Sequence, residues 1–565
     1  MGKAACSIRA ALAGGMTAWL ACYAHAAPEM IVLSSATYDS GAEDKAYALT
    51  IDGNGNIFIA GNSGNDYLFV KYNKNLQPSL PQVYSNGRSG NVPGGIAVDG
   101  FGNIVVAGME GGPTASQDYL VLKYSPDFAT LLSSASYDGG FYDRATAVIM
   151  DEQSNVYMTG FSNDGATDRF YTMKYDSLLN QVAAAAFDSG DMDQAYAMAF
   201  SGSDIIVAGV TRTGGTDDDI RLVRYDRDLN YLPPSVTFNS GGGDMAVGAA
   251  VDSAGNVIVT ARRVGTDPDF LTLKYDSTLS TLISSAVYDS GGADTPKGLA
   301  VDSADNIIVT GFTNNGGALD FFTIKYDSSL NILSTAAYDG GLADIANAVS
   351  ADPDDNVVIA GQSYGLTDNF FTVKYNASPR ITSVSPLYIG ETANVTFTGR
   401  GLLADTVVSF ADPAISTGTY SFDSGQITLS VTPAASVTLG GATVTVTNSN
   451  GEQFTNASLA RTRLRRVIPA FAPAATAITA LTELGNISVS VPAYSFTVQE
   501  TLTLYTEEAG GDAQQVGEAL FIAGTPSSVS LASMTVTLRY APADLGGYPE
   551  ASLSIGYYDP AAGWV

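Results

Sequence analysis

The stretch FFTIKYDSSLNILSTAAYDGG runs from Phe321 to Gly341, and a near copy, FLTLKYDSTLSTLISSAVYDSGG, runs from Phe270 to Gly292. The basic-Tyr dipeptide inside both copies recurs seven times, at 71–72, 123–124, 174–175, 224–225, 274–275, 325–326 and 374–375. A second marker, an aromatic residue usually followed by Asp and then by Ser or Gly, recurs at Tyr38, Tyr84, Tyr137, Phe187, Phe238, Tyr288 and Tyr338. Internal recurrence with a period of about 50 residues predicts a propeller or a solenoid.

Each repeat contains four short strand-like runs, which in the sixth repeat cover 297–302, 306–312, 321–327 and 331–339. The links between them carry Gly, Asp, Asn and Ser, as tight turns require. Four antiparallel strands repeated seven times predict an all-β chain with a seven-bladed β-propeller over residues 27–376. An outer-strand run at 30–39 precedes the first complete repeat, and the last repeat stops after its third run at 370–376. We therefore expect the N-terminal run to complete the last blade, which removes an exposed sheet edge.

The composition fits a multidomain chain that avoids anionic partners. The chain has 565 residues, too many for one ordinary domain, and 45% of them are hydrophobic, enough for a buried core. The formal net charge is −30. A surface of this sign repels nucleic acid and anionic lipid, and it favours cations or basic partners.

The N-terminus has the pattern of a secretory signal over residues 1–26. Lys3 and Arg9 give a positive start, residues 10–22 are apolar, and Ala24-His25-Ala26 predicts cleavage between Ala26 and Ala27. The alternatives are a buried first helix, or a lipoprotein with Cys22 as the lipidated residue.

Removal of this segment would restrict the chemistry of the mature chain. Both cysteines, Cys6 and Cys22, and the single histidine, His25, would leave with it, and the net charge would become −32. His- or Cys-based catalysis and His or Cys metal ligands would then be excluded. No later apolar run approaches the ~20 residues of a membrane-spanning helix. We expect a secreted, extracellular or cell-surface protein, with the periplasm as the alternative.

Two segments carry a family resemblance. AVDSADNIIVTGFT (300–313) and TIDGNGNIFIAGNS (50–63) resemble the bacterial β-propeller repeat called SBBP, over about residues 31–376. The resemblance implies the propeller fold and export from a bacterium. It implies little about chemistry.

Two sets of recurring aspartates are expected on one face, where the loops that enter the first and third strands of each repeat open. The first set, at the start of the first strand, is Asp44, Asp143, Asp193, Asp244, Asp294 and Asp344; the second repeat has none, near SGNVPGG. The second set, at the start of the third strand, is Asp66, Asp118, Asp168, Asp219, Asp269, Asp320 and Asp368. The Asp of the Tyr/Phe-Asp marker ends near the same face, at 39, 138, 188, 289 and 339. The recurring Lys or Arg lies five or six residues after the second set, which at roughly 3.3 Å per residue places it near the opposite face.

These aspartates have two readings. Asp before a strand commonly accepts backbone N–H groups in a tight turn, and repetition in nearly every blade favours that role. The alternative is a binding surface for a cation or a basic partner, with Ca²⁺ as the possible ion. No pair among them is singled out for acid–base chemistry. The turns at 52–56, 252–256, 302–306 and 352–356 resemble the start of an EF-hand loop, but Ile57 stands where that loop needs Gly, so we expect hairpin turns.

The period of 50 ends near residue 376. Residues 381–410 and 427–454, with the opening ITSVSP and the closing GGATVTVTNSNG, resemble the IPT/TIG immunoglobulin-like domain. We expect that domain over 377–460, as a β-sandwich spacer or adhesion-type module. A further β-rich domain is expected over 461–565, and we expect the chain to continue past Val565. Its basic cluster RTRLRR (461–466) suggests a linker or strand end, with a protease-sensitive junction as the alternative.

Three functions remain open from the sequence. The first is an exported, non-enzymatic platform that binds an extracellular polymer or protein. The second is an extracellular hydrolase or lyase acting on polysaccharide through propeller carboxylates, with calcium as a possible cofactor. The third is an assembly component that docks a partner protein through its acidic face. We assign no catalytic residue and no firm cofactor.

Overall fold

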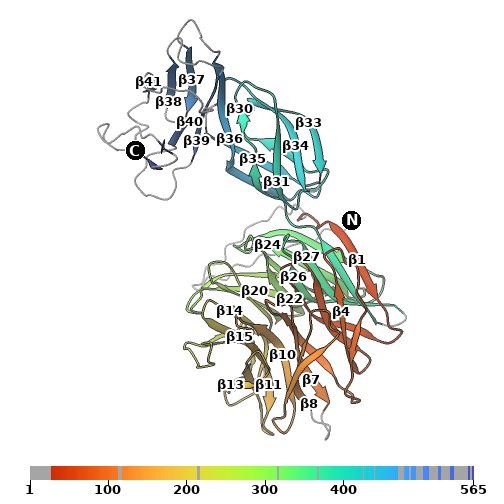
Figure 1. Cartoon of the computed structure of the whole chain (residues 1–565). Coiled ribbons are helices and arrows are strands. Elements are labelled where there is room, and N and C mark those ends of the chain that lie inside the picture. Colours follow the sequence, from red (N-terminus) through yellow and green to blue (C-terminus); the bar gives the residue numbers. More distant parts are fainter. Residues whose placement is uncertain are drawn as a thin grey trace. The chain divides into compact units, whose positions relative to one another are not determined.

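The computed structural model describes residues 27–111, 117–212, 217–314, 317–365, 368–423, 425–437 and 440–468, with short strands between 476 and 564. Two compact units divide the chain after Ala377, and Figure 1 draws both. The expected signal segment and the cleavage site after Ala26 lie largely outside the described residues. No helix in the described part of the chain has the length and apolar character needed to cross a membrane.

The described part of the first unit is entirely β, and it contains seven four-stranded antiparallel sheets. Six sheets follow chain order from the inner to the outer strand. These are β2 (Asp44–Ile51), β3 (Ile57–Ser63), β4 (Asp66–Tyr72) and β5 (Gln82–Tyr84); β6 (Val92–Val98), β7 (Ile104–Gly111), β8 (Gln117–Tyr124) and β9 (Leu131–Tyr137); β10 (Asp143–Met150), β11 (Val156–Asn163), β12 (Asp168–Tyr175) and β13 (Gln181–Phe187); β14 (Asp193–Ser201), β15 (Asp204–Thr211), β16 (Asp219–Tyr225) and β17 (Val236–Phe238); β18 (Asp244–Val251), β19 (Val257–Val264), β20 (Pro268–Tyr275) and β21 (Leu282–Tyr288); and β22 (Ala293–Val301), β23 (Ile307–Asn314), β24 (Asp320–Tyr326) and β25 (Ile332–Tyr338).

The seventh sheet combines the two ends of the unit. Its order is β26 (Asp344–Ala351), β27 (Val357–Tyr364), β28 (Asp368–Tyr375) and β1 (Val32–Tyr38). β1 pairs antiparallel with β28, from Tyr38 opposite Phe370 to Val32 opposite Tyr375. Strand β28 therefore has a neighbour on both sides, and the edge it would otherwise expose is covered.

The sheets are held side by side by apolar packing. The second and third strands of each sheet are buried along most of their length, whereas the outer strands alternate between exposed and half-buried residues. Seven buried apolar clusters occur among the described residues of the first unit, one between each pair of neighbouring sheets, including the seventh and the first. A strand packed on both faces needs continuous hydrophobic residues, which explains runs such as NIIVTG.

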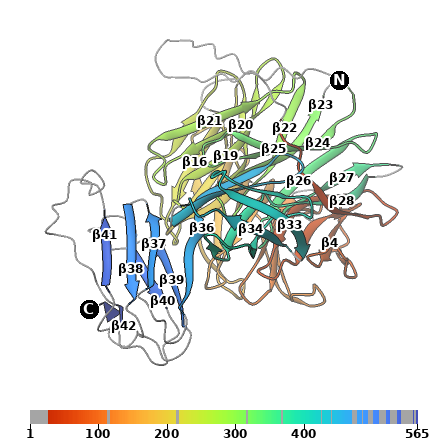
Figure 2. The same cartoon turned by 90° about the horizontal axis from the view of Figure 1, so that it is seen from above.

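The first strands of the seven sheets, β2, β6, β10, β14, β18, β22 and β26, contact one another in that order, and β26 contacts β2. We call this closed series the inner ring. Figure 2 shows the same chain from above.

The recurring lysine of the repeat joins neighbouring sheets on the side of the turns between the first and second strands. Nζ of Lys274 lies 2.8 Å from Oδ2 of Asp252 in its own sheet and donates a hydrogen bond to the Ser328 carbonyl of the next sheet, at 2.7 Å. Equivalent bonds to the next sheet come from Lys71, Lys123, Lys174 and Lys374. These lysines therefore have a structural role, because each one links its own sheet to the next.

A glycine in the second strand makes room for an aromatic ring of the preceding sheet. A Cβ added to Gly361 would lie 2.8 Å from the Phe321 ring, and one added to Gly209 would lie 2.8 Å from the Phe170 ring. Both rings are fully buried. The ring and the glycine together set how closely adjacent sheets approach.

The second unit begins with two sheets that share one buried core. One has the order β29 (Arg380–Val384), β31 (Ala393–Arg400), β34 (Gln426–Pro433) and β33 (Ile415–Asp423); the other has β32 (Val407–Phe410), β35 (Gly440–Thr447), β36 (Gln453–Ile468), β39 (Glu500–Glu507) and β40 (Ala519–Ala523), with β30 (Leu387–Tyr388) parallel to β36. Phe397, Leu429 and Val444 belong to the shared core. The remaining described strands are β37 (Thr476–Thr482), β38 (Gly485–Val491), β41 (Thr535–Arg539), β42 (Tyr558–Asp559) and β43 (Gly563–Trp564).

The basic cluster 461–466 lies within β36. This strand pairs with β35 up to Thr462 and with β39 from Arg463 onward. The expected boundary between residues 460 and 461 thus falls in the middle of a continuous strand. Strand β36 is hydrogen-bonded both to β35, which precedes the expected boundary in the sequence, and to β39, which follows it.

Candidate functional site

The aspartates at the start of the first strands are turn caps. All six side chains, Asp44, Asp143, Asp193, Asp244, Asp294 and Asp344, are fully buried. In each case Oδ2 accepts a 2.6 Å hydrogen bond from the backbone N–H four residues earlier. The carboxylate therefore closes the turn that enters the inner strand.

The Asp of the Tyr/Phe-Asp marker caps the same turn from its other side. Oδ1 of Asp289 accepts the N–H of Gly291 at 2.7 Å, and Asp138 does the same for Gly140. Gly291 and Gly140 have φ angles of 90° and 101°, a conformation that favours glycine. This explains why Gly recurs in the marker.

The second repeat, which lacks the first-set aspartate, uses Asn91 instead. Asn91 is almost fully buried, and its amide donates to Oδ1 of Asn86 and accepts the N–H of Gly111. An amide can close this turn without a charge, so the acidic set is not required for the fold at every position.

The aspartates of the second set have different partners from sheet to sheet. Asp368 forms an ion pair with Lys45 at 3.0 Å, and Asp269 lies 3.6 Å from Arg263. Asp168 accepts hydrogen bonds from Gln194 and Asn163. Asp66, Asp118, Asp219 and Asp320 also lie at the starts of third strands or next to them. This set therefore varies chemically although its positions repeat.

Three groups of carboxylates come together where one sheet meets the next. Each joins one member of the second set, one marker Asp and one member of the first set, with ligand atoms within 4.8 Å of one another. The groups are Asp118, Asp138 and Asp143; Asp269, Asp289 and Asp294; and Asp320, Asp339 and Asp344. The marker aspartates belong to these groups although they lie outside the two predicted sets.

Burial and mutual repulsion raise the pKa values in the middle group. Burial, followed by the nearby charge of Asp289, raises the pKa of Asp269 to about 6. Burial also raises the pKa of Asp294. Oδ1 of Asp269 is buried and accepts no hydrogen bond within the described structure. This carboxylate is therefore the least satisfied member of its group.

We expect Asp269 to contribute to the pH dependence of the free energy of unfolding between pH 4 and pH 6. A carboxyl whose pKa is raised on folding destabilises the folded state above the folded pKa of about 6, and that cost disappears as pH falls toward the unfolded value of 3.8. Asp269→Asn should raise the melting temperature at pH 7.5 in EDTA, and the gain should vanish near pH 4. A gain that is equal at both pH values would contradict this assignment.

The turns between first and second strands are hairpins held by their own aspartate. Oδ1 of Asp52 accepts the N–H groups of Asn54 and Asn56, and Oδ2 accepts the Asn56 amide. Asp252, Asp302 and Asp352 make the same bonds and in addition pair with the recurring lysine. These oxygen atoms are used within the turn, as expected for a hairpin.

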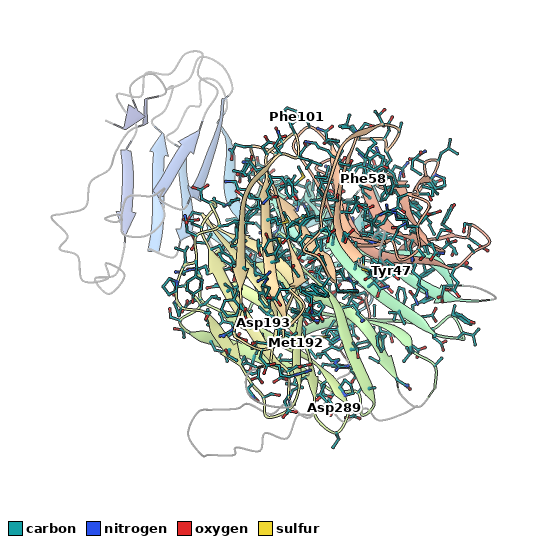
Figure 3. The ribbon with its side chains drawn as sticks, turned by 90° about the horizontal axis from the view of Figure 1, so that it is seen from below. Tyr47, Phe58, Phe101, Met192, Asp193 and Asp289 are labelled. Carbon is teal, nitrogen blue, oxygen red and sulfur yellow. The ribbon has the colours of Figure 1, made fainter. Side chains whose placement is uncertain are left out.

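The inner strands contain a position whose residue type varies from one repeat to the next. Each inner strand has a one-residue bulge three positions after the capping residue. The bulged residues are Tyr47, Gly94, Thr146, Tyr196, Val247, Lys297 and Asn347. Bulges re-aim side chains, and here they occupy one level around the axis. In Figure 3 Tyr47 lies well inside the outline of the unit, whereas Asp289 lies near its edge.

Two of the bulged residues tie neighbouring inner strands together. Thr146 donates to the Ala195 carbonyl at 2.9 Å, and Asn347 donates to the Ala46 carbonyl at 2.8 Å. These two hydrogen bonds hold the backbone of neighbouring inner strands together at the bulges. The other bulged side chains therefore start from a backbone that is held in place.

Three basic side chains from different sheets belong to this region, and we call Arg144, Arg262 and Lys297 the axial cations. Arg144 lies one residue after a cap, Lys297 is a bulged residue, and Arg262 on β19 is paired with Met245, which lies one residue after a cap. Desolvation and then the charges of Arg262 and Arg144 lower the pKa of Lys297, although the side chain remains accessible to solvent. The charges of Arg144 and Arg262 thus act on an exposed lysine that stands on a different sheet from either of them.

The sequence pattern did not point to the axial cations. We expected the basic residues of the repeat near the opposite face, and the Lys-Tyr lysines are there, but Arg144 and Lys297 belong to no recurring marker. Three stretches depart visibly from the repeat, at 86–95, 215–224 and 260–269, and of the axial cations only Arg262 lies in one of them. The signal that could have found Arg144 and Lys297 is the variation one and three residues after each cap, where the repeats carry seven and six different residue types.

Comparison with known proteins supports the repeat and adds little on chemistry. The family profile of the beta-propeller repeat SBBP matches residues 38–67. Among solved structures, a catalytically inactive virginiamycin B lyase from Staphylococcus aureus with quinupristin is similar at 9% identity and a TM-score of 0.41, covering 60% of this chain and 99% of that chain. The selenomethionine-substituted virginiamycin B lyase from Staphylococcus aureus is similar at 9% identity and a TM-score of 0.38, covering 60% and 98%. No curated protein sequence matches the chain.

Proposed function

We propose that this chain is an exported, non-enzymatic bacterial protein whose seven-bladed β-propeller is a binding platform, carried with an IPT/TIG-type sandwich at 377–460 as a spacer. The support for seven blades is the set of seven four-stranded sheets with an apolar cluster between each neighbouring pair. The support for the sandwich is the pair of sheets around one core. Export rests on the N-terminal pattern of residues 1–26.

The binding function is inferred from a difference between two kinds of polar residue: those that recur in the repeats close turns, and those that vary stand on the inner ring. The repeated aspartates of the first set close the same turn in six of the seven sheets, so they do not distinguish one of these sheets from another. The variable residues are concentrated on the inner ring, on a level that the bulges fix. A repeated β scaffold that presents variable side chains at one position of each repeat is the arrangement expected of a binding surface.

A capture experiment tests the platform against the enzyme alternative. Residues 27–565 are immobilised, incubated with bacterial envelope and extracellular polysaccharides, and the bound polymer is eluted and sized. The platform predicts saturable binding and recovery of the polymer at its original length. A polysaccharide hydrolase or lyase would return shortened chains, and the absence of binding to any polymer or extracellular protein would remove the proposal.

Calcium binding is a second candidate, favoured by the buried and unsatisfied Oδ1 of Asp269 inside a three-carboxylate group. If the groups bind Ca²⁺, calorimetry should show saturable heat with up to three ions per chain, and the melting temperature should be higher in calcium than in EDTA. Asp289→Asn should remove one site. Asp188→Asn is the matched control, because that marker Asp belongs to none of the three groups. No heat and no shift would leave these aspartates as turn caps.

A further inference from the structure

The axial cations lack anionic partners within the protein. Among the residues that the structure describes, Arg144, Arg262 and Lys297 form no ion pair with a carboxylate. Nε of Arg144 and Nε of Arg262 are buried without a hydrogen-bond acceptor. Buried polar donors normally have partners, so these two Nε–H groups are unsatisfied donors on half-buried side chains.

Three aspartates of the second set have other basic or amide partners. Asp368 pairs with Lys45, Asp168 accepts from Gln194 and Asn163, and Asp269 pairs with Arg263. The engaged groups cannot turn to the axial cations without breaking these contacts. The positive charge at the axis is therefore uncompensated in a chain whose formal net charge is −30.

Arg144 interacts electrostatically with groups on widely separated sheets. Its charge acts on Tyr47 of β2, Tyr196 of β14 and Lys297 of β22. These strands occupy the first, fourth and sixth positions of the inner ring. Arg144 stands one residue after the cap on β10, and Tyr47, Tyr196 and Lys297 are the bulged residues of other inner strands in the same closed ring. All four residues therefore belong to the strands that surround the axis.

We propose that the axial cations bind a single carboxylate group, carried on a ligand whose remaining body is polar and uncharged. A guanidinium offers paired donors that match a carboxylate, and Lys297 adds a third charged donor. Tyr47, Tyr196 and Asn347 stand on the same level. Tyr196 donates to Gln194 and Asn347 donates to the Ala46 carbonyl, so these two side chains can offer their oxygen atoms as acceptors to a polar body. The acidic groups around the ring repel a polyanion, so one negative charge fits and many do not. The inference rests on the proposed binding platform and names the chemistry of its ligand.

The test uses residues 27–565 and D-glucuronate as the probe, with D-glucose as its uncharged counterpart and inorganic phosphate as a second anion. We expect saturable binding of glucuronate, weaker binding of phosphate and none of glucose. Arg144→Gln and Lys297→Gln should each weaken glucuronate binding by about tenfold or more, because each removes a charge-assisted contact. Arg221→Gln is the matched control: Arg221 bonds Thr237 and covers the Phe187 ring, and its loss should leave binding unchanged.

Melting curves give a readout that a structural role would not produce. Without ligand, Lys297→Gln should raise the melting temperature, because it relieves repulsion among the axial cations. Glucuronate at a fixed concentration should stabilise the variant less than the wild type. If Lys297 were needed for the fold, the Lys297→Gln substitution would lower the melting temperature. The proposal is overturned if neither anion binds, if glucose binds as well as glucuronate, or if both variants bind like the wild type. Polymer capture that survives both substitutions would retain the platform and place its ligand elsewhere.

Discussion

Lys274→Met should lower the free energy of unfolding by about 3–5 kcal/mol, because it removes one member of a buried ion pair and leaves the other charge in place. Lys274 and Asp252 are both more than nine-tenths buried, and their charged atoms are 2.8 Å apart. Burial alone would raise the pKa of Asp252, but hydrogen bonds from Lys274 and Asn256 lower it. The substitution also removes the bond to the Ser328 carbonyl in the next sheet. Urea unfolding followed by far-ultraviolet circular dichroism measures the change.

The matched control is Lys71→Met in the first sheet. Lys71 is only half-buried, donates to the Pro126 carbonyl at 2.9 Å, and has no ion pair in the part of the chain that the structure describes. Its loss should cost about 1 kcal/mol. Asp252→Asn added to Lys274→Met should restore part of the stability, since no unpaired charge remains. Equal costs for the two single substitutions would show that the buried pair contributes nothing beyond the inter-sheet bond.

Removing β1 should be the most damaging truncation of the first unit. A chain that begins at Asp39 loses the pairing of Val32–Tyr38 with β28 and the packing of Tyr38 on Phe370, whose ring centres are 6.2 Å apart. At about 1 kcal/mol net for each backbone hydrogen bond, the loss amounts to several kcal/mol. The exposed edge of β28 should also promote self-association.

The control for this truncation begins at Ala27 and keeps β1. Thermal melting and analytical ultracentrifugation should show a lower melting temperature and larger species only for the shorter chain. A synthetic peptide of residues 30–38, added in trans, should restore the melting temperature by pairing with β28. If the shorter chain melts like the control and stays monomeric, β1 does not stabilise the unit.

The repeat unit and its strands could be predicted from the sequence. In the sixth repeat the expected runs at 306–312, 321–327 and 331–339 agree with β23, β24 and β25 to within two residues, and the first run begins four residues later than β22. Strand periodicity and turn residues are local properties, and the sevenfold recurrence adds their signals together. The capping role of the first aspartate set was also the favoured reading, because the bond from the carboxylate to an N–H four residues earlier is local.

The sequence by itself determined the all-β repeat, its turns and the acidic balance of the chain, since each depends on residues close together along the backbone. Only the tertiary structure decided which carboxylates meet across two sheets and that Arg144, Arg262 and Lys297 share the axis. Asp269 and Asp294 belong to adjacent sheets. Arg144 belongs to the third sheet and Lys297 to the sixth, so two sheets lie between them on the shorter way round the inner ring. Their proximity comes from the closure of the ring by packing between sheets, which no local pattern encodes.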